Sequence, residues 1–218
     1  MRHSDTMDNP KTNQAVITVG DGRGFIVGRD ENRFIITAGH CLPFFPPSMS
    51  FSTSENTTYR ALIGPLKKKP SISAECYFVD PVSDIAVLRE PDGQSLFEEY
   101  NEYSDFIDEI APFSVSDAPL RGSASLLSLK GQWFNCRIDR LGDGPLWITK
   151  AEMQIAAGMS GSPILSASGS AIGVLCAGSH TGNSKLCREG GPQAVLSRNL
   201  PVWLWRSLAS RRNKVQRA

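Results

Sequence analysis

Three residues of this sequence carry side chains that together could cleave an acyl bond: His40, Asp84 and Ser160. A serine hydroxyl is a weak nucleophile at neutral pH, so it needs a base to take its proton and a carboxylate to hold that base in the productive tautomer. We assign these roles to Ser160, His40 and Asp84, respectively. The other two histidines are poorer candidates, because His3 lies in a polar terminal segment and His180 in a turn rich in glycine and serine.

The carboxylate of the set is Asp84, which begins the apolar run Ile85–Leu88. A carboxylate at the mouth of a buried strand is costly unless it is hydrogen-bonded. A bond from His40 Nδ1–H would satisfy it and would stabilise the imidazolium that forms during the reaction. Asp80 is the competing candidate, but it precedes Pro81 and has the character of a turn residue.

Ser160 is flanked by glycines in the string Gly158-Met159-Ser160-Gly161-Ser162-Pro163. We expect the backbone N–H groups of Gly158 and Ser160 to converge on the developing oxyanion, and each such donor is worth about 10²- to 10³-fold in rate. A Cβ at position 158 would obstruct the sharp turn that this needs. The nucleophile elbow of α/β-hydrolases requires glycine where this chain has Ser162, so that fold is not indicated.

The three strings Thr37–Cys41, Asp84–Leu88 and Gly158–Pro163, in the order histidine, aspartate, serine, resemble those of the trypsin/chymotrypsin-type serine proteases. The nearest resemblance is to the bacterial trypsin-like branch, which includes the glutamyl endopeptidases and the protease domain of the HtrA family. It also takes in the run Gly24–Val27 and continues to about Gly178, covering roughly half of the chain. The resemblance implies a serine endopeptidase that acts through an acyl-enzyme.

The resemblance also places a substrate-binding pocket for the side chain at the cleaved bond. Its walls would be Gln154 and Ile155 on one side and Cys176-Ala177-Gly178 on the other. Trypsins carry an aspartate where this chain has Gln154, and glutamyl endopeptidases carry a threonine where it has Ile155. We therefore expect no preference for a basic or an acidic side chain. We expect an uncharged, partly apolar pocket.

Met159 stands where many secreted relatives carry the aspartate that a freed N-terminus engages on activation. The resemblance implies that this chain does not need that switch. It leaves open an alternative from another class, a protease-like binding or regulatory module that stays latent until a partner protein orders its oxyanion loop. Esterase activity on small acyl esters is a third reading. Turnover of peptide bonds distinguishes the endopeptidase from the latent module.

Short β-rich runs separated by turn signals predict an all-β chain. With the resemblance, this implies two six-stranded-type antiparallel β-barrels, as in chymotrypsin, with a C-terminal helix. We expect His40 and Asp84 on one barrel, Ser160 on the other, and a groove between them that suits an extended peptide. The acidic segment 96–109 fits a surface helix or an extended loop. The expected domains are a flexible tail at 1–13, an N-terminal barrel at 14–115, a C-terminal barrel at 116–200, and a helix with a basic tail at 201–218.

Charge and composition exclude several other classes of function. The formal net charge of the 218 residues is +1, so no global field draws nucleic acid or an anionic membrane. No run approaches the roughly 20 apolar residues that span a bilayer. The glycine-rich string at 20–24 superficially suggests a phosphate loop, but it leads into a strand instead of opening a helix. We therefore expect a peptide or protein substrate and no cofactor, with neither nucleic acid nor membrane as a partner.

The five cysteines are an odd number without the spacing of a zinc site, so no metal is predicted. Secreted animal relatives pair the cysteine after the catalytic histidine with one on the preceding strand, and the stretch Gly22-Arg23-Gly24 offers Cys41 no such partner. This favours a reducing compartment and a cytoplasmic location. A bridge between Cys176 and Cys187 is left open.

Overall fold

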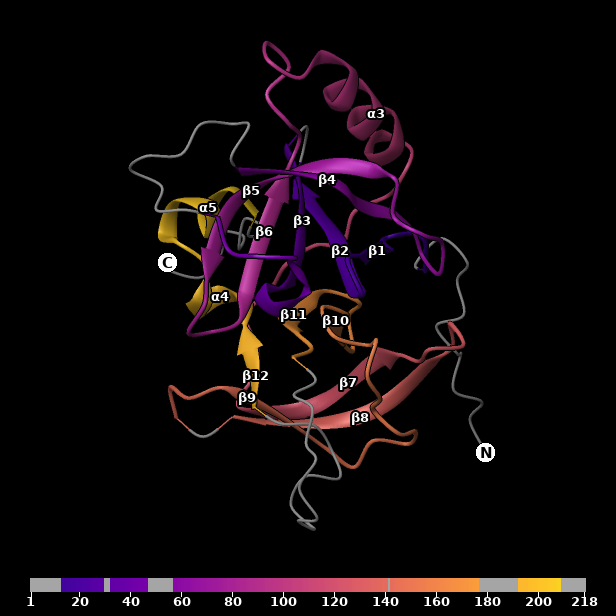
Figure 1. Ribbon diagram of the computed structural model, residues 1–218. Helices are drawn as coiled ribbons and strands as arrows, with labels where there is room; N and C mark the ends of the chain where they lie inside the picture. Colours follow the sequence, from indigo (N-terminus) through magenta and orange to yellow (C-terminus); the bar gives the residue numbers. More distant parts are fainter. Residues whose placement is uncertain (1–12, 30–31, 47–56, 141, 177–191, 209–218) are drawn as a thin grey trace.

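The chain folds into two closed six-stranded antiparallel β-barrels that follow one another in the sequence (Figure 1). The computed structural model describes residues 13–29, 32–46, 57–140, 142–176 and 192–208. The expected all-β architecture of two barrels and a C-terminal helix is confirmed.

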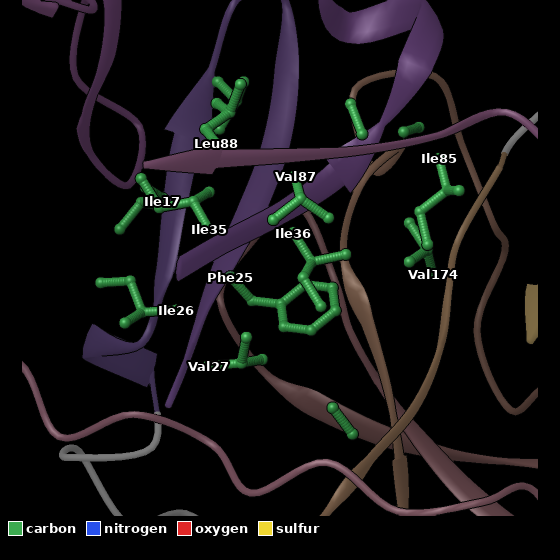
Figure 2. Close-up of a cluster of buried hydrophobic side chains, with 14 of the residues drawn as sticks. Ile17, Phe25, Ile26, Val27, Ile35, Ile36, Ile85, Val87, Leu88 and Val174 are labelled. Atoms are coloured by element: carbon green, nitrogen blue, oxygen red, sulfur yellow. The ribbon is translucent and has the colours of Figure 1, made fainter. Parts of the chain in front are cut away.

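The first barrel has the strand order β1-β2-β3-β6-β5-β4. Its interior is filled by branched aliphatic side chains together with Phe25, as Figure 2 shows. Such side chains favour strands because they pack well on a pleated surface. The strands are β1 (Val16–Val19), β2 (Gly22–Arg29), β3 (Asn32–Ala38), β4 (Thr58–Pro65), β5 (Ile72–Asp80) and β6 (Ile85–Arg89).

The second barrel has the order β10-β11-β12-β9-β8-β7. On β8 the buried residues Phe134, Cys136 and Ile138 alternate with the exposed Asn135 and Arg137, the period of two that strand geometry imposes. The closing strand β12 has no comparable signal in the sequence. The strands are β7 (Arg121–Leu127), β8 (Trp133–Arg140), β9 (Leu146–Thr149), β10 (Pro163–Ser166), β11 (Ala171–Val174) and β12 (Pro192–Val195).

A connector between the barrels pairs with a strand of each. Phe113 bridges to Val27 on β2, and its N–H donates to Ile26 O at 2.9 Å. Two residues further on, Val115 bridges to Ala171 on β11. The connector therefore ties the two barrels together through backbone hydrogen bonds.

The hydrophobic core of the first barrel continues into the second. Val174 on β11 belongs to the same buried cluster as Ile85 on β6 and lies beside it in Figure 2. Leu127 and Leu165 of the second barrel belong to this cluster as well. Because the shared core excludes water between the barrels, residues on the two sides of the interface are held in a fixed relation.

Helices pack on the outside of both barrels. The acidic segment 96–109, expected to be a surface helix or an extended loop, forms the helix α3 (Phe97–Asp108). It buries Tyr103 and Ile107 and lies over the first barrel (Figure 1). Near the end of the chain, α4 (Leu196–Asn199) precedes α5 (Val202–Leu208), and Trp203 packs edge-on against Tyr77 of β5 with ring centroids 5.3 Å apart. In the part of the chain that the structure describes, no helix is both long and apolar enough to cross a bilayer.

Arg33 on β3 binds the C-terminal end of α3. Its Nη1 donates to Ile107 O at 2.6 Å, to Asp108 O at 2.9 Å and to Ile110 O at 2.9 Å. The last carbonyls of a helix have no partner within it, and a cation there also meets the negative end of the helix dipole. One side chain thus holds α3 to the barrel.

We predict that Arg33→Ala lowers the free energy of unfolding by about 1–3 kcal/mol, because the carbonyls lose a charged donor. Urea denaturation measures this. The control is Arg60→Ala, whose side chain is 82% exposed and reaches Glu99 only at 4.0 Å; its loss should be about 0.5 kcal/mol or less. Equal losses in the two variants would contradict the role given to Arg33.

Candidate active site

His40 lies directly after the end of β3. The strand stops at Ala38, and the 3₁₀ turn Gly39–Cys41 buries its two outer residues while His40 remains exposed. A Cβ on Gly39 would lie only 3.2 Å from Asp84 Oδ1, so a glycine here allows the backbone to approach the carboxylate closely. The turn therefore presents the imidazole beside Asp84.

Asp84 is hydrogen-bonded to this turn at three points. His40 Nδ1 lies 2.6 Å from Asp84 Oδ2, the His40 N–H donates to Oδ1 at 2.8 Å, and the Gly39 N–H donates to the Asp84 carbonyl at 3.0 Å. The backbone of Asp84 has φ +53°, which is uncommon for a residue other than glycine. Conformations of this kind persist where the surroundings hold them, and they gather at functional sites.

The geometry of this pair selects a tautomer. An ionised carboxylate only accepts hydrogen bonds, so the neutral His40 ring carries its hydrogen on Nδ1 where it meets Asp84 Oδ2. The other ring nitrogen, Nε2, then has a free lone pair. This is the form of imidazole that can take a proton from a hydroxyl.

Asp80, the competing carboxylate, has a different task. Its Oδ1 accepts the N–H of Val82 at 2.9 Å and that of Ser83 at 3.2 Å, the pattern of a turn-forming aspartate. Burial opposes ionisation of this carboxyl, but the hydrogen bonds from Ser83 and Val82 together outweigh it and lower the pKa of Asp80. The structure thus places Asp84, and not Asp80, against the His40 ring.

Ser160 lies in a turn between two glycines with positive φ, +85° at Gly158 and +79° at Gly161. The obstruction expected from a Cβ at position 158 arises within the turn itself, because a φ of +85° brings a Cβ too close to the local backbone. The space around the turn is open, since the nearest other atom to such a Cβ would be Leu129 Cδ2 at 3.6 Å. Met159, which lies between Gly158 and Ser160 in the sequence, is buried.

The two N–H groups expected to form an oxyanion hole are those of Gly158 and Ser160. Among the described residues, no acceptor takes either N–H. The turn is held at neighbouring points, by the Met159 N–H on Ala156 O at 3.2 Å and the Gly161 N–H on Leu175 O at 2.7 Å. Both N–H groups are therefore unengaged by any described group.

The serine turn rests on strand β2 of the first barrel. The Arg23 N–H donates to the Ser160 carbonyl at 2.8 Å. The position that a Cβ on Gly22 would occupy lies 2.9 Å from Ser160 O and 2.5 Å from Cys41 Sγ. The serine turn of the second barrel and the histidine turn of the first thus meet over the same strand.

No hydrogen bond joins Ser160 Oγ to His40, although both residues lie within the described part of the chain. The pair His40–Asp84 is formed, whereas Ser160 Oγ is not hydrogen-bonded to it. Contacts between a nucleophile and its base are often long before substrate binds and shorten in the complex.

Of the residues expected to wall a specificity pocket, three are described. Gln154 is exposed, Ile155 packs at the edge of the second core, and Cys176 is half-buried. Ala177 and Gly178 lie outside the described residues. The sequence did not point to Gln193, a fully buried residue of β12 whose Oε1 accepts the Cys176 N–H at 2.5 Å.

Two cysteines lie close to the histidine turn, and neither is suited to act as the nucleophile. Burial raises the pKa of the Cys41 thiol to about 11, and burial followed by the nearby Asp84 charge raises that of Cys176 to about 12. Both therefore stay protonated at neutral pH. Cys176 donates to the Asp84 carbonyl at 3.5 Å. Cys187, with which a bridge was left open, lies outside the described residues.

Within the described residues, no three His, Cys, Asp or Glu side chains are grouped so that they could hold an ion. The chemistry available is that of a hydroxyl, an imidazole, a carboxylate and two backbone donors.

We predict that Gly161→Ala costs more than about 4 kcal/mol of stability, because strain combines with a clash. A Cβ on Gly161 would lie 1.8 Å from Arg23 O. The control, Gly169→Ala, has nearly the same φ of +78° but nothing within 4 Å of the added Cβ, and its cost should be about 1–2 kcal/mol. Urea denaturation compares the two, and similar losses would show that the contact with β2 is loose.

No protein-family model matches this sequence, and no curated protein matches it either. Solved structures are similar at low sequence identity. The Rv3671c protease of M. tuberculosis in an inactive form is 14% identical, with 96% of this chain and 100% of that chain covered and a TM-score of 0.54. A serine-to-alanine mutant of it, also in an inactive form, is 16% identical over 91% of this chain and 92% of that one, with a TM-score of 0.52.

A third similar structure comes from Sesbania mosaic virus, where aromatic interactions drive the coupled folding and binding of the intrinsically disordered VPg protein. It is 14% identical, with 94% of this chain and 91% of that chain covered and a TM-score of 0.51. At such identities the likeness shows the fold. The two barrels have the chymotrypsin-like arrangement of serine proteases.

Proposed function

We propose that this chain, which has the chymotrypsin-like fold, is a serine endopeptidase that hydrolyses peptide bonds with His40, Asp84 and Ser160. The observation that carries the proposal is the short contact of 2.6 Å between His40 Nδ1 and Asp84 Oδ2 beside the serine turn. A fold hosts many activities, so the weight rests on this site and its tautomer.

In the proposed reaction, Ser160 Oγ attacks the carbonyl carbon of the substrate while His40 Nε2 takes its proton. The N–H groups of Gly158 and Ser160 stabilise the negative oxygen that develops. His40 then donates the proton to the leaving amine, which departs and leaves an acyl-enzyme on Ser160. A water molecule, deprotonated by His40, hydrolyses this ester and restores the hydroxyl.

The substrate is proposed to be a peptide or protein with an uncharged side chain at the cleaved bond. Gln154 and Ile155 supply neither a carboxylate nor a cation. Cys176 and the chain after it would pair with the substrate backbone as an added strand. Free thiols at Cys41 and Cys176 favour a reducing location such as the cytoplasm.

A second candidate function is a latent protease-like module that a partner protein activates. The observation in its favour is that no hydrogen bond joins the described side chains of Ser160 and His40. A partner, or the substrate itself, would have to close this contact. Turnover by the purified protein alone separates the two candidates.

The test is to incubate the purified chain with a peptide library and identify cleaved bonds by mass spectrometry, with Ser160→Ala as the matched variant. Cleavage that disappears in Ser160→Ala supports an endopeptidase that is active alone. A wild-type chain that circular dichroism shows to be folded, but that cleaves neither peptides nor ester substrates, contradicts the first proposal and favours the latent module.

We predict that Asp84→Asn lowers kcat by about 10⁴-fold, because the amide would donate to His40 Nδ1 and force the hydrogen onto Nε2. The matched control is Asp80→Asn, which neutralises a carboxylate four residues away but leaves an amide oxygen to accept the turn N–H groups. It should leave kcat nearly unchanged. Steady-state kinetics on a cleaved peptide measures both. Comparable losses would mean that Asp84 is not the partner of His40.

A further inference from the structure

Arg23 on β2 is buried at the interface of the two barrels, with 3% of its surface exposed. Its Nη1 donates to Leu127 O at 2.8 Å and to Ser162 Oγ at 3.4 Å, and its Nη2 donates to Ser128 O at 3.1 Å. One guanidinium thus spans the end of β7 and the residue two positions after Ser160.

Among the described residues, only neutral groups meet the charge of Arg23, and no carboxylate lies within 4.0 Å of its guanidinium. Burial lowers its pKa, yet an arginine keeps its proton. An apolar side chain of similar volume would avoid the cost of removing this cation from water. A buried cation with no carboxylate partner in the described part of the chain, beside a proposed active site, therefore calls for a role other than stability.

The backbone of the same residue also holds the serine turn. The Arg23 N–H donates to Ser160 O at 2.8 Å, and Arg23 O accepts the Thr37 hydroxyl at 2.6 Å. This carbonyl is also packed so closely against Gly161 that a Cβ there would lie 1.8 Å from it. The turn is thus clamped by the backbone of Arg23 on one side and by its side chain at Ser162 on the other.

We propose that Arg23 is a positioning residue, whose guanidinium holds the turn carrying Ser160 in register with the histidine turn of the first barrel. This positioning requires the several N–H donors of a guanidinium, because they reach two carbonyls of the second barrel and the Ser162 hydroxyl at the same time. The effect on catalysis rests on the proposed function, whereas the effect on the turn does not.

The first experiment compares wild type with Arg23→Met and Arg23→Lys by hydrogen exchange of amides 158–162, read by mass spectrometry. We expect exchange in Arg23→Met to be about tenfold faster or more, the factor that corresponds to one lost charged hydrogen bond. Arg23→Lys should fall between the two, because an ammonium is a point charge without the fork. Unchanged exchange in both variants would overturn the proposal. If Arg23→Met fails to fold, the same comparison is made with Arg23→Lys.

The second experiment measures kcat, KM and thermal stability of the same variants on a cleaved peptide. We expect Arg23→Met to have an unchanged or higher melting temperature and an unchanged KM, while its kcat falls about 10- to 100-fold. Arg23→Lys should recover part of the lost kcat. The control is Arg121→Met, on a side chain that is 82% exposed and pairs with Asp139 at 3.0 Å; it should change none of these.

The two experiments separate the possible failures. If wild type cleaves no peptide while amides 158–162 exchange faster in Arg23→Met, the proposed function fails and the positioning role stands. If wild type is active and kcat falls only in proportion to lost stability, Arg23 is a structural residue and the proposal is overturned.

Discussion

The contact between the serine turn and strand β2 is the constraint on which the rest of this structure depends. The Arg23 N–H meets Ser160 O at 2.8 Å, and Gly161 lies so close to Arg23 O that no larger residue fits. This contact joins two barrels whose cores are already continuous, so the proposed nucleophile of one and the proposed base of the other share a reference strand. Close packing makes such an interface stiff, which is what a site divided between two barrels requires.

Within the first barrel, backbone contacts also hold His40, the proposed base. Asp84 has a left-handed backbone at the start of a fully buried strand, and in return its carboxylate accepts both the main-chain N–H and the ring Nδ1 of His40. The energy stored in this conformation is offset by hydrogen bonds that also select the tautomer. Strain, orientation and protonation state are thus coupled at one residue.

The sequence predicted an all-β chain because strand signals are local: alternation on β8 and β-branched runs on β3 and β6 do not depend on distant contacts. The arrangement in two barrels was implied by the family resemblance. The sequence also indicated which side chains to compare, since motif spacing is visible in one dimension. It did not reveal the four-residue strand β12, which carries Gln193. So short a strand depends on the neighbouring strands of the closed barrel. The role of Arg23 was hidden as well, because its partners lie more than 100 positions away along the chain.

The most direct measurement of the central claim is the site of covalent labelling by a fluorophosphonate, located by peptide mass spectrometry after reaction with the native protein. Such reagents require a serine that an adjacent base activates and that oxyanion donors face. We expect a single adduct on Ser160 that is lost on denaturation before labelling. A folded protein that carries no adduct, or carries it on another residue, would contradict the assignment of Ser160 as the nucleophile.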